Sequence, residues 1–83
     1  MNKRFILYVK RKCPFCVKAT TFLRDADIPF SAVAFDKRPL ALSEMKEVYN
    51  WPTVPMVFEE MEEGTYKLVG GYTDLLQRLE GKS

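Results

Sequence analysis

The first 35 residues constrain the fold most, because two hydrophobic patterns alternate along them. Residues 4–9 are apolar nearly throughout, which predicts a strand buried on both faces. From Cys13-Pro14 to about residue 26, apolar side chains recur at helical spacing, at Ala19, Phe22, Leu23 and Ala26. Residues 30–35 again favour a strand. Short turns between these segments predict a right-handed βαβ unit whose two strands are parallel.

The remaining residues predict a helix, a β-hairpin and a final helix. Pro39 suits the first turn of a helix whose inner face would hold Ala41, Met45, Val48 and Tyr49. Residues 54–60 and 65–69 favour two strands joined by an acidic turn through Gly64. The last helix would stop at Gly81 and bury a stripe of Tyr72, Leu75, Leu76 and Leu79. The order βαβ-α-ββ-α predicts an α/β fold, with one mixed four-stranded sheet and helices on both faces.

The composition limits both the size of the protein and its chemistry. A chain of 83 residues has room for one core, so residues 1–83 are expected to form a single domain. The absence of histidine excludes Ser-His and Cys-His nucleophile pairs and Cys2His2 zinc sites. Two cysteines cannot build a four-thiolate site within one chain, and they are too few for a disulfide framework. No metal is expected.

The amino terminus and the charge pattern bear on location and partners. The apolar run at residues 5–9 is too short for a signal peptide or a membrane span, so we expect a cytoplasmic protein without membrane contact. Residues 1–24 hold seven basic side chains and no acidic one. This pattern fits either an ordinary solvated face or an anion-binding surface beside the cysteines. Because the sequence shows no recognisable nucleic-acid-binding module, we expect no nucleic-acid partner.

The segment Cys13-Pro14-Phe15-Cys16 is the chemical centre of the sequence. Two cysteines three residues apart on a first helical turn lie close enough for a disulfide. The helix N-terminus and the nearby Lys10 and Lys12 would stabilise a thiolate on Cys13. Cys16 lies one turn further in and should stay protonated and less accessible. An exposed attacking thiol with a recessed resolving thiol is what thiol–disulfide exchange needs.

Two other interpretations of the cysteine pair remain open at this point. The cysteines fit a pair of small buried hydrophobic side chains, although Cys13 follows a basic turn and has no apolar position to fill. They also fit half of a metal site that a second chain completes. A C-x-x-C motif beside a βαβ pattern favours redox chemistry over both.

Three motifs together resemble the glutaredoxin family, in its small dithiol class within the thioredoxin superfamily. They are Cys13-Pro14-Phe15-Cys16 after a first strand, Thr53-Val54-Pro55 before a third, and Gly70-Gly71-Tyr72-Thr73-Asp74 at the start of the last helix. The resemblance covers the whole chain and implies the thioredoxin-like glutaredoxin fold. Thioredoxin itself is less similar, since it carries Gly-Pro between its cysteines and has a longer chain.

The resemblance implies a glutathione site around the cysteine pair. The Val54-Pro55 bond is expected to be cis and to present the backbone of Val54 to an extended peptide. The helix start at Gly71, Tyr72, Thr73 and Asp74 would hold the γ-glutamyl end of glutathione, with Asp74 binding its ammonium group. Lys10 would meet the glycyl carboxylate. Phe15 would cover the site where many dithiol members carry tyrosine, and Thr53 completes the set. Trp51 is expected to be a packing lid.

The implied activity is that of a glutathione-dependent thiol–disulfide oxidoreductase with a Cys13/Cys16 redox pair. Its expected partners are glutathione and disulfide-bearing or glutathionylated proteins, ribonucleotide reductase being one candidate, and a monomer is expected. Two alternatives stay open. One is an iron–sulfur carrier, in which Cys13 of two chains and two glutathiones hold a cluster. The other is a dedicated reductant of one enzyme, fed by a thioredoxin-type reductase.

Overall fold

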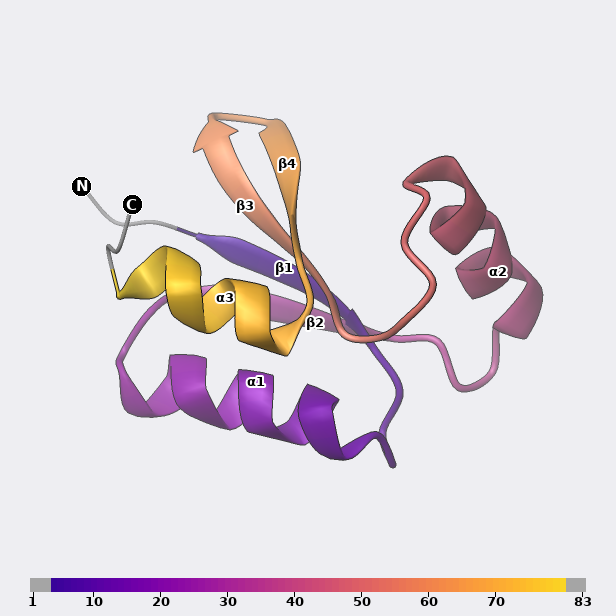
Figure 1. The fold of residues 1–83 in the computed structure, drawn as a ribbon, viewed down its shortest axis with the longest axis horizontal. Helices are drawn as coiled ribbons and strands as arrows, with labels where there is room; N and C mark the ends of the chain where they lie inside the picture. Colours follow the sequence, from indigo (N-terminus) through magenta and orange to yellow (C-terminus); the bar gives the residue numbers. More distant parts are fainter. Residues whose placement is uncertain (1–3, 81–83) are drawn as a thin grey trace.

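A computed structural model describes residues 4–80 of the chain (Figure 1). Its elements follow the predicted order, with bounds that differ from the predicted ones by a residue or two. They are β1 (Phe5–Val9), α1 (Pro14–Asp25), β2 (Phe30–Ala34), α2 (Pro39–Val48), β3 (Met56–Glu62), β4 (Thr65–Gly70) and α3 (Tyr72–Leu79). The predicted stop at Gly81 lies outside the described residues.

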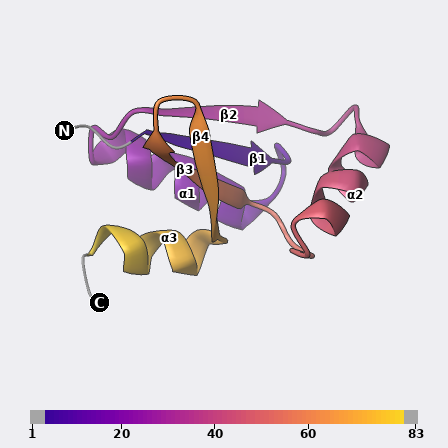
Figure 2. The ribbon, with the colours of Figure 1, turned by 90° about the horizontal axis from the view of Figure 1, so that it is seen from above.

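The four strands form one mixed sheet in the order β2-β1-β3-β4. Strand β1 pairs parallel with β2 and antiparallel with β3, so Leu7 lies between Ala32 and Val57. Strands β3 and β4 form the predicted hairpin, which turns through Gly64 at a φ of 83°. Figure 2 shows β2 at one edge of the sheet, with β1 inside it. The predicted parallel βαβ unit is therefore confirmed.

Each face of the sheet has its own hydrophobic cluster. One cluster joins the sheet to α1 and α3, which contact each other, and contains Phe5, Leu7, Val9, Cys16, Ala19, Leu23, Val57 and Leu75. The other joins the opposite face to α2 and contains Phe35, Leu42, Met56 and Phe58. Alternate side chains of β1 enter the two clusters, since Ile6 and Tyr8 are half-buried in the second. Strand β1 is thus covered on both faces, as predicted.

The inner face of α2 differs from the predicted one. Leu42 is buried, whereas Val48 and Tyr49 are 69% and 42% exposed. Figure 1 shows the reason, because α2 stands beyond one end of the sheet and does not lie along it. The side of the helix that carries Ala41, Leu42 and Met45 packs against the second cluster, and Val48 lies outside it. The prediction that Val48 shares the core face with Ala41 and Met45 is wrong, whereas Tyr49 does contact the second cluster, with its ring centroid 4.9 Å from that of Phe58.

Two smaller differences concern α1 and β2. Helix α1 ends at Asp25, so Ala26 is its exposed C-cap and not the end of the buried stripe. Strand β2 ends at Ala34, one residue before the predicted end. The four residues that follow Phe30 in β2 are all exposed, because β2 is an edge strand and no strand within the described residues covers its outer edge.

Candidate active site

Cys13 occupies the N-cap position of α1, directly after the turn that follows β1. Its backbone is extended there, with φ −85° and ψ 117°, and Pro14 follows in the first turn, where a missing N–H costs nothing. The Cys13 Sγ accepts a hydrogen bond from the Cys16 N–H at 3.4 Å. A sulfur that takes the capping role faces unpaired backbone donors at the positive end of the helix dipole. The Cys13 sulfur thus lies at the N-terminal end of α1, in contact with a backbone donor.

Cys16 occupies a different environment, although it lies only one turn away. Its side chain is 2% exposed and belongs to the cluster beneath α1 and α3, whereas Cys13 is half-buried at the surface. Burial, followed by the hydrogen bond to Cys13, raises the pKa of Cys16 from 9.0 to about 12. The structure therefore contains two free thiols of unequal accessibility, with Cys16 held in its protonated form.

A carboxylate from the loop after β2 holds the turn before Cys13. The backbone N–H of Arg11 donates to both oxygens of Asp36, at 3.1 and 3.2 Å. The Lys10 carbonyl accepts from the Cys13 N–H at 3.2 Å, which closes the same turn. The charge of Asp36 also contributes to the raised pKa of Cys16. Asp36 was not among the predicted site residues. It lies 25 residues from Arg11 in the sequence, so no local sequence pattern links the two.

The loop before β3 approaches the cysteine pair from the other side. The Cys13 thiol lies 3.7 Å from the carbonyl oxygen of Val54 and donates to it. The Val54–Pro55 peptide bond is cis, as the resemblance implied. Pro55 is buried and Val54 half-buried between the two clusters, while Thr53 is exposed. The loop thus brings the backbone of Val54 to Cys13.

The start of α3 forms the third side of this region. Gly71 is the N-cap, and its N–H donates to the Asp74 Oδ2 at 2.9 Å. Tyr72 is half-buried, and its ring centroid lies 6.0 Å from that of the exposed Phe15. The Lys18 Nζ lies 5.3 Å from the Phe15 ring, close enough for a cation–π contact. Thr73 is exposed. Phe15 and Tyr72 therefore join α1 to α3 next to Cys13.

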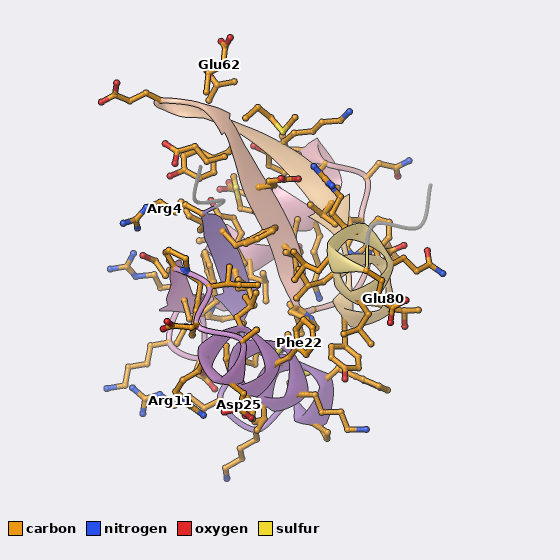
Figure 3. The ribbon with its side chains drawn as sticks, turned by 90° about the vertical axis from the view of Figure 1, so that its left-hand side faces the viewer. Arg4, Arg11, Phe22, Asp25, Glu62 and Glu80 are labelled. Carbon is orange, nitrogen blue, oxygen red and sulfur yellow. The ribbon has the colours of Figure 1, made fainter. Side chains whose placement is uncertain are left out.

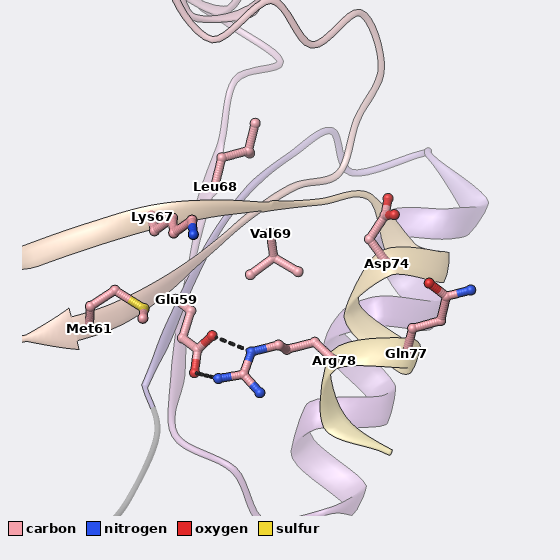
Figure 4. Close-up of a pocket in the computed structure, with 8 residues that line it drawn as sticks. All are labelled: Glu59, Met61, Lys67, Leu68, Val69, Asp74, Gln77 and Arg78. Atoms are coloured by element: carbon pink, nitrogen blue, oxygen red, sulfur yellow. Dashed lines mark hydrogen bonds and ion pairs between the residues drawn. The ribbon is translucent and has the colours of Figure 1, made fainter. Parts of the chain in front are cut away.

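The residues predicted to hold the two ends of glutathione line different cavities. Lys10 and Cys16 line a groove of about 300 Å³ between α1 and β2. Asp74 lines a cavity of about 450 Å³ between α3 and the hairpin, together with Glu59, Lys67 and Arg78 (Figure 4). The structure brings Cys13 into contact with both Cys16 and Val54, while Lys10 and Asp74 line separate cavities.

The Glu59–Arg78 ion pair is a second feature that the sequence did not reveal. Arg78 donates from Nε and Nη2 to the two carboxylate oxygens of Glu59, at 2.8 and 3.0 Å (Figure 4). Glu59 is 4% exposed, at the end of the buried part of β3. The sequence signal was a carboxylate directly after the apolar run of Met56, Val57 and Phe58. This pair fixes α3 to the hairpin.

Trp51 belongs to the framework of the site, which agrees with its predicted role as a packing lid. It packs against the second cluster, and its Cζ2 would lie 3.7 Å from a β-carbon at Gly71. Its indole therefore spans from the loop before β3 to the start of α3. The indole Nε1 is buried and has no hydrogen-bond partner within residues 4–80.

Comparison with protein families assigns the fold and its chemistry. The family model of glutaredoxin matches residues 5–62, which include both cysteines and the Thr53-Val54-Pro55 loop. The chain belongs to the glutaredoxin family. Glutaredoxins are thiol–disulfide oxidoreductases, so the family supports this general activity for the cysteine-bearing fold. A comparison with curated protein sequences gave no match.

Solved glutaredoxin structures resemble this one over nearly its whole length. Wheat glutaredoxin is 28% identical with a TM-score of 0.77, and the match covers 93% of this chain and 71% of the wheat chain. A glutaredoxin from Brucella melitensis is 25% identical with a TM-score of 0.66, covering 95% and 82%. Glutaredoxin 1 from Francisella tularensis, solved with cacodylate, is 24% identical with a TM-score of 0.70, covering 94% and 93%. At 24% identity, the Francisella tularensis structure supports the thioredoxin-like fold alone.

In residues 4–80, side-chain grouping bears on metal binding and helix length on membrane insertion. Within that range, no group of three or more cysteine, aspartate or glutamate side chains is arranged to hold a metal ion. No helix in the same part of this glutaredoxin is long and apolar enough to cross a membrane.

Proposed function

We propose that this glutaredoxin is a glutathione-dependent oxidoreductase that reduces protein disulfides and glutathione mixed disulfides through Cys13 and Cys16. The observation that carries the proposal is the inequality of the two thiols. Cys13 caps a helix at the surface and accepts the Cys16 N–H at 3.4 Å, while Cys16 is 2% exposed. Cys13 is therefore the attacking sulfur and Cys16 the resolving sulfur.

In the first step the Cys13 thiolate attacks one sulfur of a substrate disulfide. A bond forms between Cys13 and that sulfur as the substrate S–S bond breaks, and the leaving thiolate takes up a proton. The Cys16 N–H and the helix dipole stabilise the thiolate before the attack. The carbonyl of Val54, 3.7 Å from the Cys13 Sγ, is available to accept a backbone N–H of an extended substrate once the thiol proton is gone.

In the dithiol route Cys16 then loses its proton and attacks the Cys13 sulfur. The second substrate thiol leaves, and a Cys13–Cys16 disulfide remains. Burial is the main cause of the raised pKa of Cys16, and the hydrogen bond to Cys13 is the second. A mixed disulfide on Cys13 alters this second contribution, which favours deprotonation of Cys16 at that stage. Two glutathiones reduce the disulfide and leave as glutathione disulfide. In the monothiol route Cys13 takes the glutathionyl group, and one glutathione releases it.

We assign the binding of glutathione to the residues around Cys13. Lys10 is exposed beside the cysteine pair and supplies the cation for the glycyl carboxylate. The backbone of Val54 would align the cysteinyl part, and the N-terminal turn of α3 would receive the γ-glutamyl part. The complete set is Lys10, Phe15, Thr53, Val54, Pro55, Gly71, Tyr72, Thr73 and Asp74.

The proposal extends to the setting in which the protein works. We infer that residues 1–83 form one domain that acts as a monomer in the cytoplasm, with glutathione as co-substrate. Its protein substrates are disulfide-bearing or glutathionylated proteins, and ribonucleotide reductase is one candidate. No membrane or nucleic-acid partner is part of the proposal.

The roles of the cysteines are tested by single serine substitutions. Cys13→Ser should abolish both activities, because it removes the attacking sulfur. Cys16→Ser should keep removal of glutathione from a glutathionylated peptide but lose reduction of an intramolecular protein disulfide. The two activities are measured separately with each variant. Equal loss of peptide deglutathionylation in both variants would show that the assigned roles are wrong.

The choice of reductant is tested on the oxidised protein. Glutathione at a cellular concentration should reduce the Cys13–Cys16 disulfide rapidly, whereas a thioredoxin reductase with NADPH should reduce it slowly. The rate is followed by the increase in free thiol. Fast turnover only with the reductase would overturn the dependence on glutathione and leave the oxidoreductase activity intact.

A further inference from the structure

Strand β2 presents an unpaired edge to solvent. Within residues 4–80, β1 is its only hydrogen-bonding neighbour in the sheet, and Figure 2 shows no helix or strand on its outer side. The Phe35 N–H donates to the Val9 carbonyl at 2.9 Å, and the Phe5 N–H donates to the Pro29 carbonyl at 3.1 Å. Because backbone groups alternate along a strand, those of Ala32 and Ala34 point away from β1.

This edge lacks the features that usually prevent a sheet from adding a strand. The segment Phe30–Ala34 contains no charged residue and no proline, and its register with β1 runs without a bulge. Ser31, Ala32, Val33 and Ala34 are all exposed. An extended chain could therefore reach the outward N–H and C=O groups without displacing any described segment.

Basic side chains flank both sides of this strand. The groove between α1 and β2 is lined by Lys10, Arg11 and Arg24 around an apolar floor that includes Phe30 and Ala32. A second cavity of about 300 Å³, at the end of β2, is lined by Val33, Ala34, Arg11, Asp36, Lys37 and Arg38. Asp36 is the single acidic residue lining either cavity, and its carboxylate already accepts the Arg11 N–H. In Figure 3, Arg11 projects on the side away from α3.

We propose that β2 is a docking edge for an acidic, extended segment of a partner protein, which adds to the sheet as a fifth strand. The backbone of Ala32 and Ala34 would supply hydrogen bonds, and the basic side chains would select for glutamate and aspartate. The same positive charges disfavour the pairing of β2 with β2 of a second copy. This docking requires no cysteine chemistry, so it stands apart from the proposed oxidoreductase activity.

The proposal is tested with the full chain and a cysteine-free peptide of about ten residues that alternates glutamate with threonine. Backbone amide signals of Ala32 and Ala34 should shift on titration and become protected from hydrogen exchange. The dissociation constant should rise with salt concentration, because the contact depends on charge. A lysine–threonine peptide of equal length should not bind.

Two kinds of variant separate strand pairing from simple charge attraction. Ala32→Pro removes an outward N–H but no donor to β1, so it should abolish binding of the acidic peptide. Arg24→Gln and Arg38→Gln should each weaken binding by about two- to fivefold, as expected for single exposed charges. These two variants keep the test decisive if Ala32→Pro does not fold. Lys67→Gln, which removes one charge from the opposite edge strand β4, is the matched control and should leave binding unchanged.

Several outcomes would overturn the proposal. These are equal binding of the acidic and basic peptides, amide shifts confined to β4 or to the Cys13 region, and dimerisation of the free protein through β2. Binding of a single-stranded oligonucleotide to the basic grooves, without binding of the acidic peptide, would also overturn it and indicate a nucleic-acid surface.

Discussion

At the scale of single residues, the two cysteines show how position controls reactivity. Both are free thiols on the first turn of α1, three residues apart. Cys13 faces backbone donors and solvent, while Cys16 faces Ala19, Leu23 and the other side chains of the cluster under α1 and α3. The same helical turn therefore leaves one sulfur accessible at the surface and buries the other. The motif predicts this division, and the packing of α1 against the sheet produces it.

The raised pKa of Cys16 predicts a loss of stability at high pH. In the folded, reduced protein the pKa of Cys16 is about 12, above its ordinary value of 9.0. The contribution of the protonated Cys16 thiol to the free energy of unfolding is therefore fully present below pH 9. As the pH rises through the window from 9.0 to about 12, the unfolded state loses its proton first, and this contribution disappears. The free energy of unfolding should fall by up to about 1.4 kcal/mol per pH unit there.

This loss is measured by urea unfolding of the reduced protein at several pH values above and below 9.0. The Cys16→Ser variant should lack the part of the pH-dependent fall in the free energy of unfolding that Cys16 contributes. Tyr8, whose pKa is raised by burial and by the charge of Tyr49, acts in the same direction in both proteins and cancels in the comparison. Parallel pH profiles for the wild type and the variant would contradict the prediction.

At the scale of elements, the junction between β4 and α3 is the most constrained. Gly70 has a φ of 132°, and a β-carbon there would lie 2.5 Å from the Asp74 Oδ2. The same oxygen accepts the Gly71 N–H that starts α3. The turn therefore needs a residue without a side chain so that the capping carboxylate can reach its donor.

Replacing this glycine should damage the start of α3. Gly70→Ala combines a disfavoured φ with a displaced Asp74, so we expect a loss of about 2–4 kcal/mol in the free energy of unfolding. Gly64→Ala is the matched control, because Gly64 also has a positive φ but its added carbon would meet nothing within 4 Å. It should cost about 1 kcal/mol. Denaturant unfolding checks both values, and equal losses would show that contact with Asp74 is unimportant.

The elements themselves were largely predictable from hydrophobic spacing. Period-two and period-3.6 patterns set the order of strands and helices, and the prolines and glycines set most of their ends. The burial of Leu42 in place of Val48 was not predictable, because it depends on α2 standing beyond the sheet, where Leu42 meets Phe35 and Met56. The Arg11–Asp36 and Glu59–Arg78 contacts were missed for a similar reason, since the topology joins residues 25 and 19 positions apart.

At the scale of the whole molecule, charge is separated between two ends. Basic residues lie in the turn before Cys13 and in the loop after β2, while the hairpin carries an acidic group of Glu60, Glu62 and Glu63. Figure 3 shows Glu62 and Arg11 at opposite ends of the view. The net charge of +2 hides this separation. The positive end lies beside Cys13, where its field attracts anions.

This separation predicts a salt-dependent rate for charged substrates. The reaction of reduced protein with glutathione disulfide should slow by about tenfold from low to high ionic strength, because screening removes the attraction. Reaction with an uncharged disulfide, such as 2-hydroxyethyl disulfide, should change little. Stopped-flow measurement of the first turnover checks both. An equal response of the two disulfides to salt would contradict charge-assisted encounter.

The position of Trp51 gives the molecule an internal optical reporter. It is the one tryptophan of the chain, and its indole lies between the loop that contacts Cys13 and the helix start at Gly71. Indole emission depends on the polarity and the quenching groups around the ring. Oxidation of the cysteine pair or occupation of the neighbouring surface should therefore change the intrinsic fluorescence, so turnover can be followed in real time without a label.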